Sequence, residues 1–317
     1  NNWFVQRIEP LLGLYGSPKY RDLDPSYFFA PFMVLFFGFC LGDTGYGLSM
    51  YLLAHWMDKK FGSSVEGFSR VMQLSKAFAV AAMIIGLLTG SIFGYDFVNR
   101  DWILLDVSVG PGNPMLLFYL ALGLGVVHLS LSYILGAMQA RTRQEVLFKM
   151  GLLAVLLGGV SLVAWNIWFS APGTVAHGLS YYGGIAALSF GLLLILLFAS
   201  DHHNWFVRLG LGVWSIYGLT GLMGDLLSYA RLFGLGVATS AIAAVMNQLA
   251  GMVYQAMGPV LGAVAAVFVI IIGHAFNFAL SLLGSTVHSA RLHFVEAFKS
   301  FFEGGGVPYK PFRIEKG

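Results

Sequence analysis

Charged residues are scarce in this sequence, and cysteine is almost absent. Only 10% of the 317 residues are charged, whereas 57% are hydrophobic and the mean hydropathy is +0.75. Such a chain cannot bury all its apolar surface in one soluble core, which excludes a water-soluble globular domain. Because Cys40 is the single cysteine, an internal disulfide and a multi-cysteine metal site are excluded as well.

Motifs for nucleotides and metals are also missing. No GxxxxGK[ST] segment occurs, so we expect no P-loop nucleotide binding. The His202-His203 pair lacks companion ligands and does not indicate a metal site. The sequence therefore predicts no metal, no cofactor, no nucleic-acid partner and no catalysis by the chain alone.

Long apolar segments are what the sequence contains instead. A bilayer crossing needs about 20 apolar residues, and several segments reach or exceed this length. We expect the first to break near Asp43, in Gly42-Asp43-Thr44-Gly45, and to form a short helical hairpin; the last two should join near Gly258-Pro259. The segments are residues 27–57, 71–97, 114–138, 149–169, 180–199, 209–257 and 259–302.

Basic residues alternate from loop to loop. Lysine and arginine occur after residues 57, 140 and 200 and in the C-terminal tail, whereas 98–113 and 170–179 contain only Arg100. The positive-inside rule then places both termini in the cytoplasm and predicts an all-α, polytopic membrane protein with about eight helices. Residues 209–257 cross once, so this helix and the last one exceed a ~30 Å bilayer and must be strongly tilted.

A polar stripe follows the last helix. At ~100° per residue, six polar side chains fall within about 120° of one another. This pattern predicts a polar path, and interhelical hydrogen bonds that only hold helices together are the alternative. The six residues are His274, Asn277, Ser281, Ser285, His288 and Arg291.

The preceding helix carries Arg231 among leucine and phenylalanine residues. A guanidinium stays charged, and placing it in hydrocarbon costs about 2.5–3.5 kcal/mol, so a compensating partner is expected. Asp225, Ser228 and Thr239 share its side of the helix, and Asn247, Gln248 and Gln255 continue beyond. Elsewhere, Asp43 is either a channel carboxylate or the N-cap of a helix, and His128, Ser130 and Ser132 fit interhelical hydrogen bonds.

Three motifs stand out: GDTGYG at 42–47, SYARLF at 228–233 and HSARLHFVEAFKSFFEGGGVPYKPF at 288–312. With them, essentially the whole chain resembles the membrane half of subunit a, or subunit I, of rotary V-type and archaeal or bacterial A/V-type ATPases. The resemblance implies a stator beside a rotating ring of proteolipid c/L subunits, with two offset proton half-channels coupled to ATP synthesis or hydrolysis. It also implies that the chain contacts membrane lipid and, through an N-terminal domain that is not included, peripheral-stalk subunits. The expected location is a prokaryotic plasma membrane.

The resemblance assigns roles to individual residues. Arg231 and Arg291 match the two arginines of the family, and Arg231 would face the ring carboxylate, favour its ionised form and block a proton leak. Eukaryotic members have a histidine and a glutamate where this chain has Thr239 and Ser281, which favours a prokaryotic enzyme. The expected proton path comprises His274, Asn277, Ser281, Ser285, His288, Thr239, Ser228, Asp225, Gln248, Gln255, Asp43 and Glu296.

Three parts of the chain are expected to differ in role. Residues 1–26 would be a linker from the N-terminal cytoplasmic domain, 27–302 the transmembrane proton-channel domain and 303–317 a cytoplasmic tail. The residues alone leave two other functions open. One is a self-contained secondary transporter or ion channel whose arginine binds an anion, and the other is a scaffold whose polar stripes are packing seams.

Overall fold

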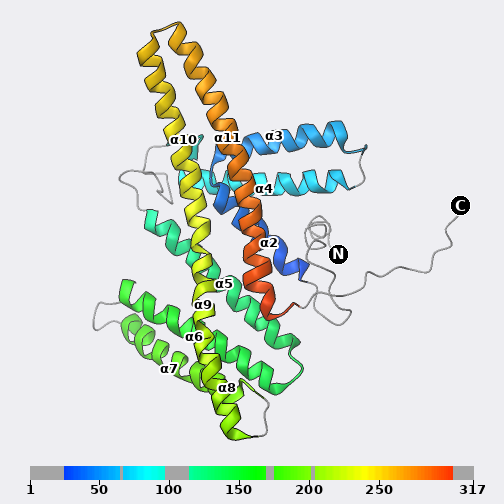
Figure 1. Ribbon diagram of the computed structural model, residues 1–317, viewed down its shortest axis with the longest axis vertical. Helices are drawn as coiled ribbons and strands as arrows, with labels where there is room; N and C mark the ends of the chain where they lie inside the picture. The colour runs from blue at the N-terminus through cyan, green and yellow to red at the C-terminus, as the bar shows by residue number, and fades with distance from the viewer. Residues whose placement is uncertain (1–24, 65–66, 97–113, 169–174, 201–203, 303–317) are drawn as a thin grey trace, which may run out of the picture. The chain divides into compact units, whose positions relative to one another are not determined.

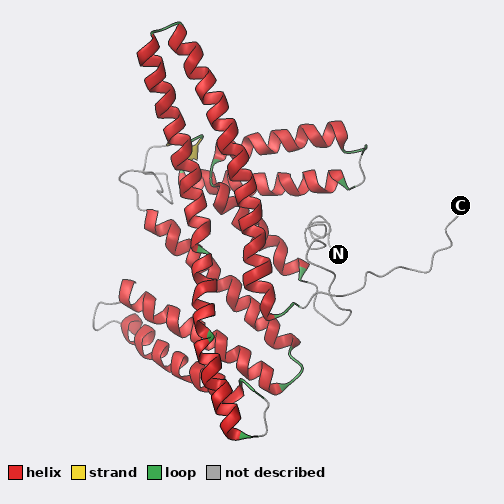
Figure 2. Cartoon of the chain, viewed as in Figure 1, coloured by secondary structure: helices red, strands yellow, loops and turns green. Residues whose placement is uncertain are grey.

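The computed structural model describes residues 25–64, 67–96, 114–168, 175–200 and 204–302. Within these ranges every regular element except one small β-hairpin is helical (Figures 1 and 2), which confirms the predicted fold class. The expected C-terminal tail, and the expected linker apart from Pro25 and Ser26, lie outside the described residues. The chain divides into two compact units: unit 1 is Asn1–Phe29, Leu129–Leu222 and Phe294–Gly317, and unit 2 is Ala30–His128 and Met223–His293.

Several helical segments of the described chain are long and apolar enough to cross a membrane, as predicted for a polytopic protein. A further apolar helix, α2 (Ser26–Leu41), is shorter, and α3 (Thr44–Phe61) follows it directly. With these two helices the structure has the expected eight segments. The six long segments are Phe68–Thr89, Met115–Gln139, Arg143–Ile167, His177–Phe198, Trp205–Met257 and Leu261–Ser300.

The first apolar segment breaks where the sequence indicated. Gly42 has a φ of +46°, which glycine adopts without a steric penalty, and Asp43 is extended and caps α3. The expected hairpin is nevertheless wrong in one respect. Helix α3 packs along α4 (Phe68–Thr89) and not along α2, so α2 and α3 form a corner (Figure 1).

A short β-hairpin follows α4 in unit 2. Strands β1 (Ser91–Ile92) and β2 (Tyr95–Asp96) pair in antiparallel fashion around a turn at Phe93 and Gly94. Both turn residues have positive φ, 49° and 72°, and Phe93 is the only non-glycine residue of the described chain in that region. Helix α5 (Pro114–Gln139) then contributes residues to both units.

The long segment 205–257 is less regular than the sequence predicted. It consists of α8 (Trp205–Tyr217), α9 (Leu219–Ser228) and α10 (Ala230–Met257), with interruptions at Gly218 and Tyr229. Gly258, with a φ of +78°, lies at the predicted reversal, and α11 (Leu261–Arg291) runs back beside α10. Within unit 2, α3 and α4 cross this pair at a steep angle (Figure 1). The strong tilt expected of segment 209–257 and of the last helix relative to a membrane stays a prediction.

Unit 1 is built on glycine-mediated helix packing. Helices α6 (Arg143–Trp168) and α7 (Val175–Phe198) lie side by side, and a Cβ on Gly158 would come within 2.6 Å of the Leu188 amide nitrogen. Such close backbone contact is how helices gain packing energy in lipid. The chain continues after α11 as a π-helix, Leu292–Ala297, and a 3₁₀ turn, Phe298–Ser300.

Candidate functional site

Polar side chains of α10 and α11 meet in a buried seam of unit 2. The Thr239 and Ser281 hydroxyl oxygens lie 2.9 Å apart, and the Ser281 hydroxyl lies 3.4 Å from the Asn277 carbonyl oxygen, to which it donates. The Asn277 amide in turn donates to the Thr239 backbone carbonyl at 3.0 Å. All three residues are buried. Asn277 and Ser281 of the predicted stripe therefore face the neighbouring helix.

The seam extends to His274 through a residue that the sequence reasoning did not select. The Tyr46 hydroxyl accepts a hydrogen bond from the Asn277 amide at 2.9 Å and lies 2.7 Å from His274 Nδ1. On the other side of the imidazole, His274 Nε2 lies 2.9 Å from the Asn247 carbonyl oxygen, and the Asn247 amide donates to the Phe93 backbone carbonyl at 2.8 Å. The signal for Tyr46 was present, since it belongs to the GDTGYG motif.

Asp43 organises the corner beside this seam. Its Oδ1 accepts from the amides of Tyr46 and Phe93, both at 3.0 Å. Its Oδ2 accepts from the Ser91 hydroxyl at 2.7 Å and from the Gly94 amide at 3.2 Å. The side chain is fully buried, and the bond from the Tyr46 amide in the first turn of α3 confirms the N-cap interpretation. Its assignment to a proton path stays a prediction.

Arg231 lies in the first turn of α10, next to α11. Its Nη1 is 3.4 Å from His288 Nδ1. Because a guanidinium can only donate, His288 must accept at Nδ1 and carry its hydrogen on Nε2 when it is neutral. Between His288 and the Ser281 end of the seam lies Ser285, whose hydroxyl is buried without a partner among the described residues.

The other expected path residues lie outside this seam. Ser228 is half-buried and donates to the Gly224 carbonyl of its own helix at 3.0 Å. Asp225 is half-buried in α9, and Glu296 is buried in the π-helix of unit 1. The structure leaves three expected residues exposed: Gln248, Gln255 and Arg291.

A second polar cluster in unit 2 was not assigned to a site from the sequence. His128 Nδ1 lies 2.8 Å from the Tyr229 hydroxyl, and the His128 and His293 rings pack with centroids 4.6 Å apart. The Phe36 ring packs edge-on against His128 and Tyr229 and at a tilt against His293. His293 belongs to the third motif, but it lies between Leu292 and Phe294, so its sequence neighbours did not indicate a polar site. The expectation that His128 makes an interhelical hydrogen bond is confirmed. The same expectation for Ser130 is wrong, because its hydroxyl is buried without a hydrogen-bond partner among the described residues.

Ser132, the other residue expected to join helices, does so in unit 1. Its hydroxyl donates to the Ala297 carbonyl and contacts the Ser300 hydroxyl. Lys149 adds bonds from Nζ to the carbonyls of Gly136 at 3.1 Å and Ser300 at 2.8 Å. A lysine on α6 therefore holds the end of the last helix.

Together the elements of unit 2 place a fixed cation, two imidazoles, a phenol, amides and hydroxyls on adjoining apolar helices. Intramembrane groups of this kind bind ions or relay protons. No group of three or more histidine, cysteine or acidic side chains within the described ranges could hold a metal ion. The fold and this seam define a polytopic helical membrane protein with a buried polar seam between its helices.

Comparisons with known proteins identify the relatives of this chain. It is 32% identical over 327 residues to A-type ATP synthase subunit I of Pyrococcus abyssi, covering 100% of the chain and 47% of that protein. The same subunit of Methanocaldococcus jannaschii is 27% identical, with 98% of the chain and 48% of that protein covered. V-type ATP synthase subunit I of Chlamydia pneumoniae is 26% identical, with 96% and 53% covered. No family model matches the chain.

These relatives confirm the resemblance seen in the three motifs. The chain is a homologue of A-type and V-type ATP synthase subunit I, and it spans about half the length of the curated relatives that it matches.

Proposed function

We propose that the chain forms the membrane-embedded stator of a rotary A/V-type ATPase and couples proton movement to ATP synthesis or hydrolysis. Similarity to subunit I over nearly the whole chain supports the assignment to this complex. The observation that carries the mechanism is the position of Arg231, half-buried in an apolar helix and facing His288 across the α10–α11 pair.

The missing partner of Arg231 would be a carboxylate on a rotating ring of proteolipid c/L subunits. A permanent cation favours the ionised form of an approaching carboxyl group, so each ring site would release its proton on reaching Arg231. The same charge repels protons, which prevents them from crossing directly between two half-channels. Arg291 adds a second cation one turn beyond His288 on α11.

The seam from His274 to His288 would line part of one half-channel. Its hydroxyls and imidazoles are groups that exchange protons through hydrogen bonds. Peripheral-stalk subunits would bind through an N-terminal domain. The loop charges favour cytoplasmic termini. Thr239 and Ser281, where eukaryotic members have a histidine and a glutamate, favour a prokaryotic plasma membrane.

Replacing Arg231 by lysine tests the proposal. Lysine keeps a charge but lacks the planar fork and can lose its proton in an apolar site. We expect the assembled ATPase to retain ATP hydrolysis but to lose most ATP-driven proton pumping in vesicles.

Arg208→Lys is the matched control, because Arg208 lies on α8 in unit 1 and bonds to the Leu197 carbonyl. This control should pump normally. Normal coupling in the Arg231→Lys enzyme, or solute uptake by the chain alone in liposomes, would contradict the proposal and favour a self-contained transporter.

A further inference from the structure

The hydrogen bonds around His274 have only one consistent direction, because two backbone carbonyls fix both ends. The Phe93 carbonyl can only accept, so the Asn247 NH₂ group must face it at 2.8 Å. The Thr239 carbonyl likewise requires the Asn277 NH₂ group at 3.0 Å. Neither side-chain amide can turn over without losing its bond and placing two oxygens against each other.

The orientation of Asn247 determines the tautomer of His274. With its NH₂ group on Phe93, Asn247 presents its carbonyl oxygen to His274 Nε2 at 2.9 Å. An oxygen acceptor requires a hydrogen on that nitrogen. In the neutral imidazole, Nδ1 is then an acceptor, and the Tyr46 hydroxyl at 2.7 Å is its donor.

Asn277 fixes the Tyr46 hydroxyl from the other side. Its NH₂ group donates to the Tyr46 oxygen at 2.9 Å, so that oxygen already accepts one hydrogen bond. If Nδ1 of His274 gained a proton, it too would point at the Tyr46 oxygen. The tyrosine hydrogen would then have to leave the bond, and an unpaired polar hydrogen in a buried position is unfavourable.

We propose that Tyr46 is a positioning residue that, with Asn247 and Asn277, holds His274 as the neutral tautomer with its hydrogen on Nε2. Proton uptake at Nδ1 then requires the Tyr46 hydroxyl to rotate away. The inference deepens the proposed function, on which its consequence for proton flux rests, whereas the tautomer itself depends only on this chain.

The His274 imidazole has contacts from three elements of unit 2 among the described residues. Tyr46 comes from α3, Asn247 from α10, and the Phe93 ring packs edge-on with its centroid 5.6 Å from the imidazole. Asp43 is the charged group of the same corner, because its Oδ1 accepts from the amides of Tyr46 and Phe93. Its Oδ2 accepts from the Ser91 hydroxyl and the Gly94 amide, so none of these four hydrogen bonds comes from His274. The hydrogen-bond direction at His274 is therefore set by the two amides and Tyr46.

Nitrogen-15 NMR of histidine-labelled chain in lipid nanodiscs reads the tautomer, with His274→Gln used to assign the signals. We expect the wild-type His274 to show a hydrogen-bearing Nε2 and a bare Nδ1, and to keep this pattern between about pH 8 and 5, where free histidine titrates. A hydrogen on Nδ1, or an ordinary titration near pH ~6.5, would overturn the proposal.

Tyr46→Phe should allow His274 to titrate within that range. The matched control is Tyr51→Phe, the same change five residues along α3, which should leave the signals as in the wild type. Asn247→Asp offers a second route, since a carboxylate on Nε2 favours the doubly protonated ring, and this variant should show a charged His274. Unchanged His274 signals in both variants would refute the assignment.

Proton flux in the assembled ATPase separates this inference from the proposed function. If Tyr46 holds His274 neutral, the pH profile of proton flux in the Tyr46→Phe enzyme should gain a titration step near pH ~6.5. The wild type and Tyr51→Phe should lack this step. If His274 shows the expected tautomer but the assembly pumps no protons, only the proposed function is rejected. A normal pump with a freely titrating wild-type His274 would reject the inference alone.

Discussion

Replacing Asp43 distinguishes a structural carboxylate from a proton-carrying one. The wild-type side chain accepts four hydrogen bonds, from the amides of Tyr46, Phe93 and Gly94 and from the Ser91 hydroxyl. Asparagine retains one oxygen for the first two amides, and its NH₂ group can donate to Ser91. It cannot accept from Gly94, so Asp43→Asn loses one charged hydrogen bond, which is worth about 1.5–3 kcal/mol.

Asp43→Ala removes all four bonds, including the helix cap. At the same value of about 1.5–3 kcal/mol for each bond to a charged group, the loss in the free energy of unfolding is at most roughly 6–12 kcal/mol. The expected order of stability is therefore wild type, then Asp43→Asn, then Asp43→Ala. Asp58→Asn on the same helix is a control whose effect should stay within about 1 kcal/mol, the usual limit for a partly exposed ion pair.

Cys40 supplies the assay for this series. It is the single cysteine of the chain and is fully buried, so a thiol-reactive fluorophore labels it only when unit 2 opens. Thermal labelling curves in nanodiscs then report the transition temperature of each variant. If Asp43→Ala unfolds at the wild-type temperature while proton flux is abolished, Asp43 is a channel carboxylate and the structural account is wrong.

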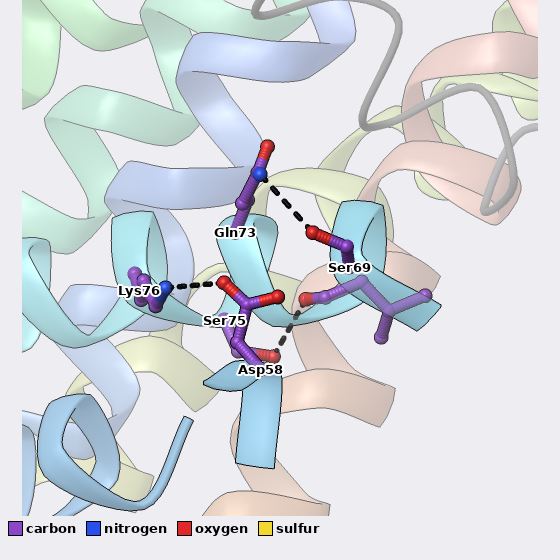
Figure 3. A network of polar contacts seen from close by, with 6 residues as sticks. Asp58, Ser69, Gln73, Ser75 and Lys76 are labelled. Carbon is purple, nitrogen blue, oxygen red and sulfur yellow. Dashed lines mark hydrogen bonds and ion pairs between the residues drawn. The ribbon is translucent and has the colours of Figure 1, made fainter. Parts of the chain in front are cut away.

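Two smaller predictions use other parts of the fold. A Cβ on Gly125 would lie 2.6 Å from Cγ of the buried Tyr229 ring, so Gly125→Ala should destabilise the chain by about 1–3 kcal/mol, whereas Gly123→Ala, with open space around it, should not. Bonds from Lys76 and then Ser69 lower the pKa of the Asp58 carboxyl group, and Lys76 Nζ lies 2.6 Å from its Oδ2 (Figure 3). A lowered folded-state pKa stabilises the protein above the unfolded value of ~3.9. Thermal unfolding should therefore show an advantage over Asp58→Asn at neutral pH that disappears as the pH falls through the lowered pKa, and a difference that persists in acid would contradict this origin.

The sequence predicted the elements that depend on composition and periodicity. Long apolar segments identified the spanning helices, Gly42-Asp43 identified a helix break and Gly258-Pro259 a chain reversal, because backbone requirements at these positions are local. The three- and four-residue spacing of polar groups on α11 likewise predicted a polar path or a helix–helix seam. Each of these features can be read from one segment at a time.

The features that it could not predict depend on pairs of distant segments. Tyr46 and His274 meet only because α3 packs at the α10–α11 pair, and nothing local to either residue indicates the other. Phe93 enters the seam by its backbone carbonyl, which carries no sequence signal at all. Gln248 and Gln255 were included because they follow the polar face, yet the helix turns them to the outside. Tertiary packing decides such cases.

A disulfide cross-link tests the central claim that Arg231 faces the carboxylate of the ring. In a Cys40→Ala background, cysteine would replace Arg231 and the ring carboxylate, and the membrane assembly would be oxidised. The account predicts a cross-link between the chain and the ring, and no cross-link from Leu193→Cys, an exposed position on α7 in unit 1. Failure of Arg231→Cys to reach the ring, or equal cross-linking from Leu193→Cys, would contradict it.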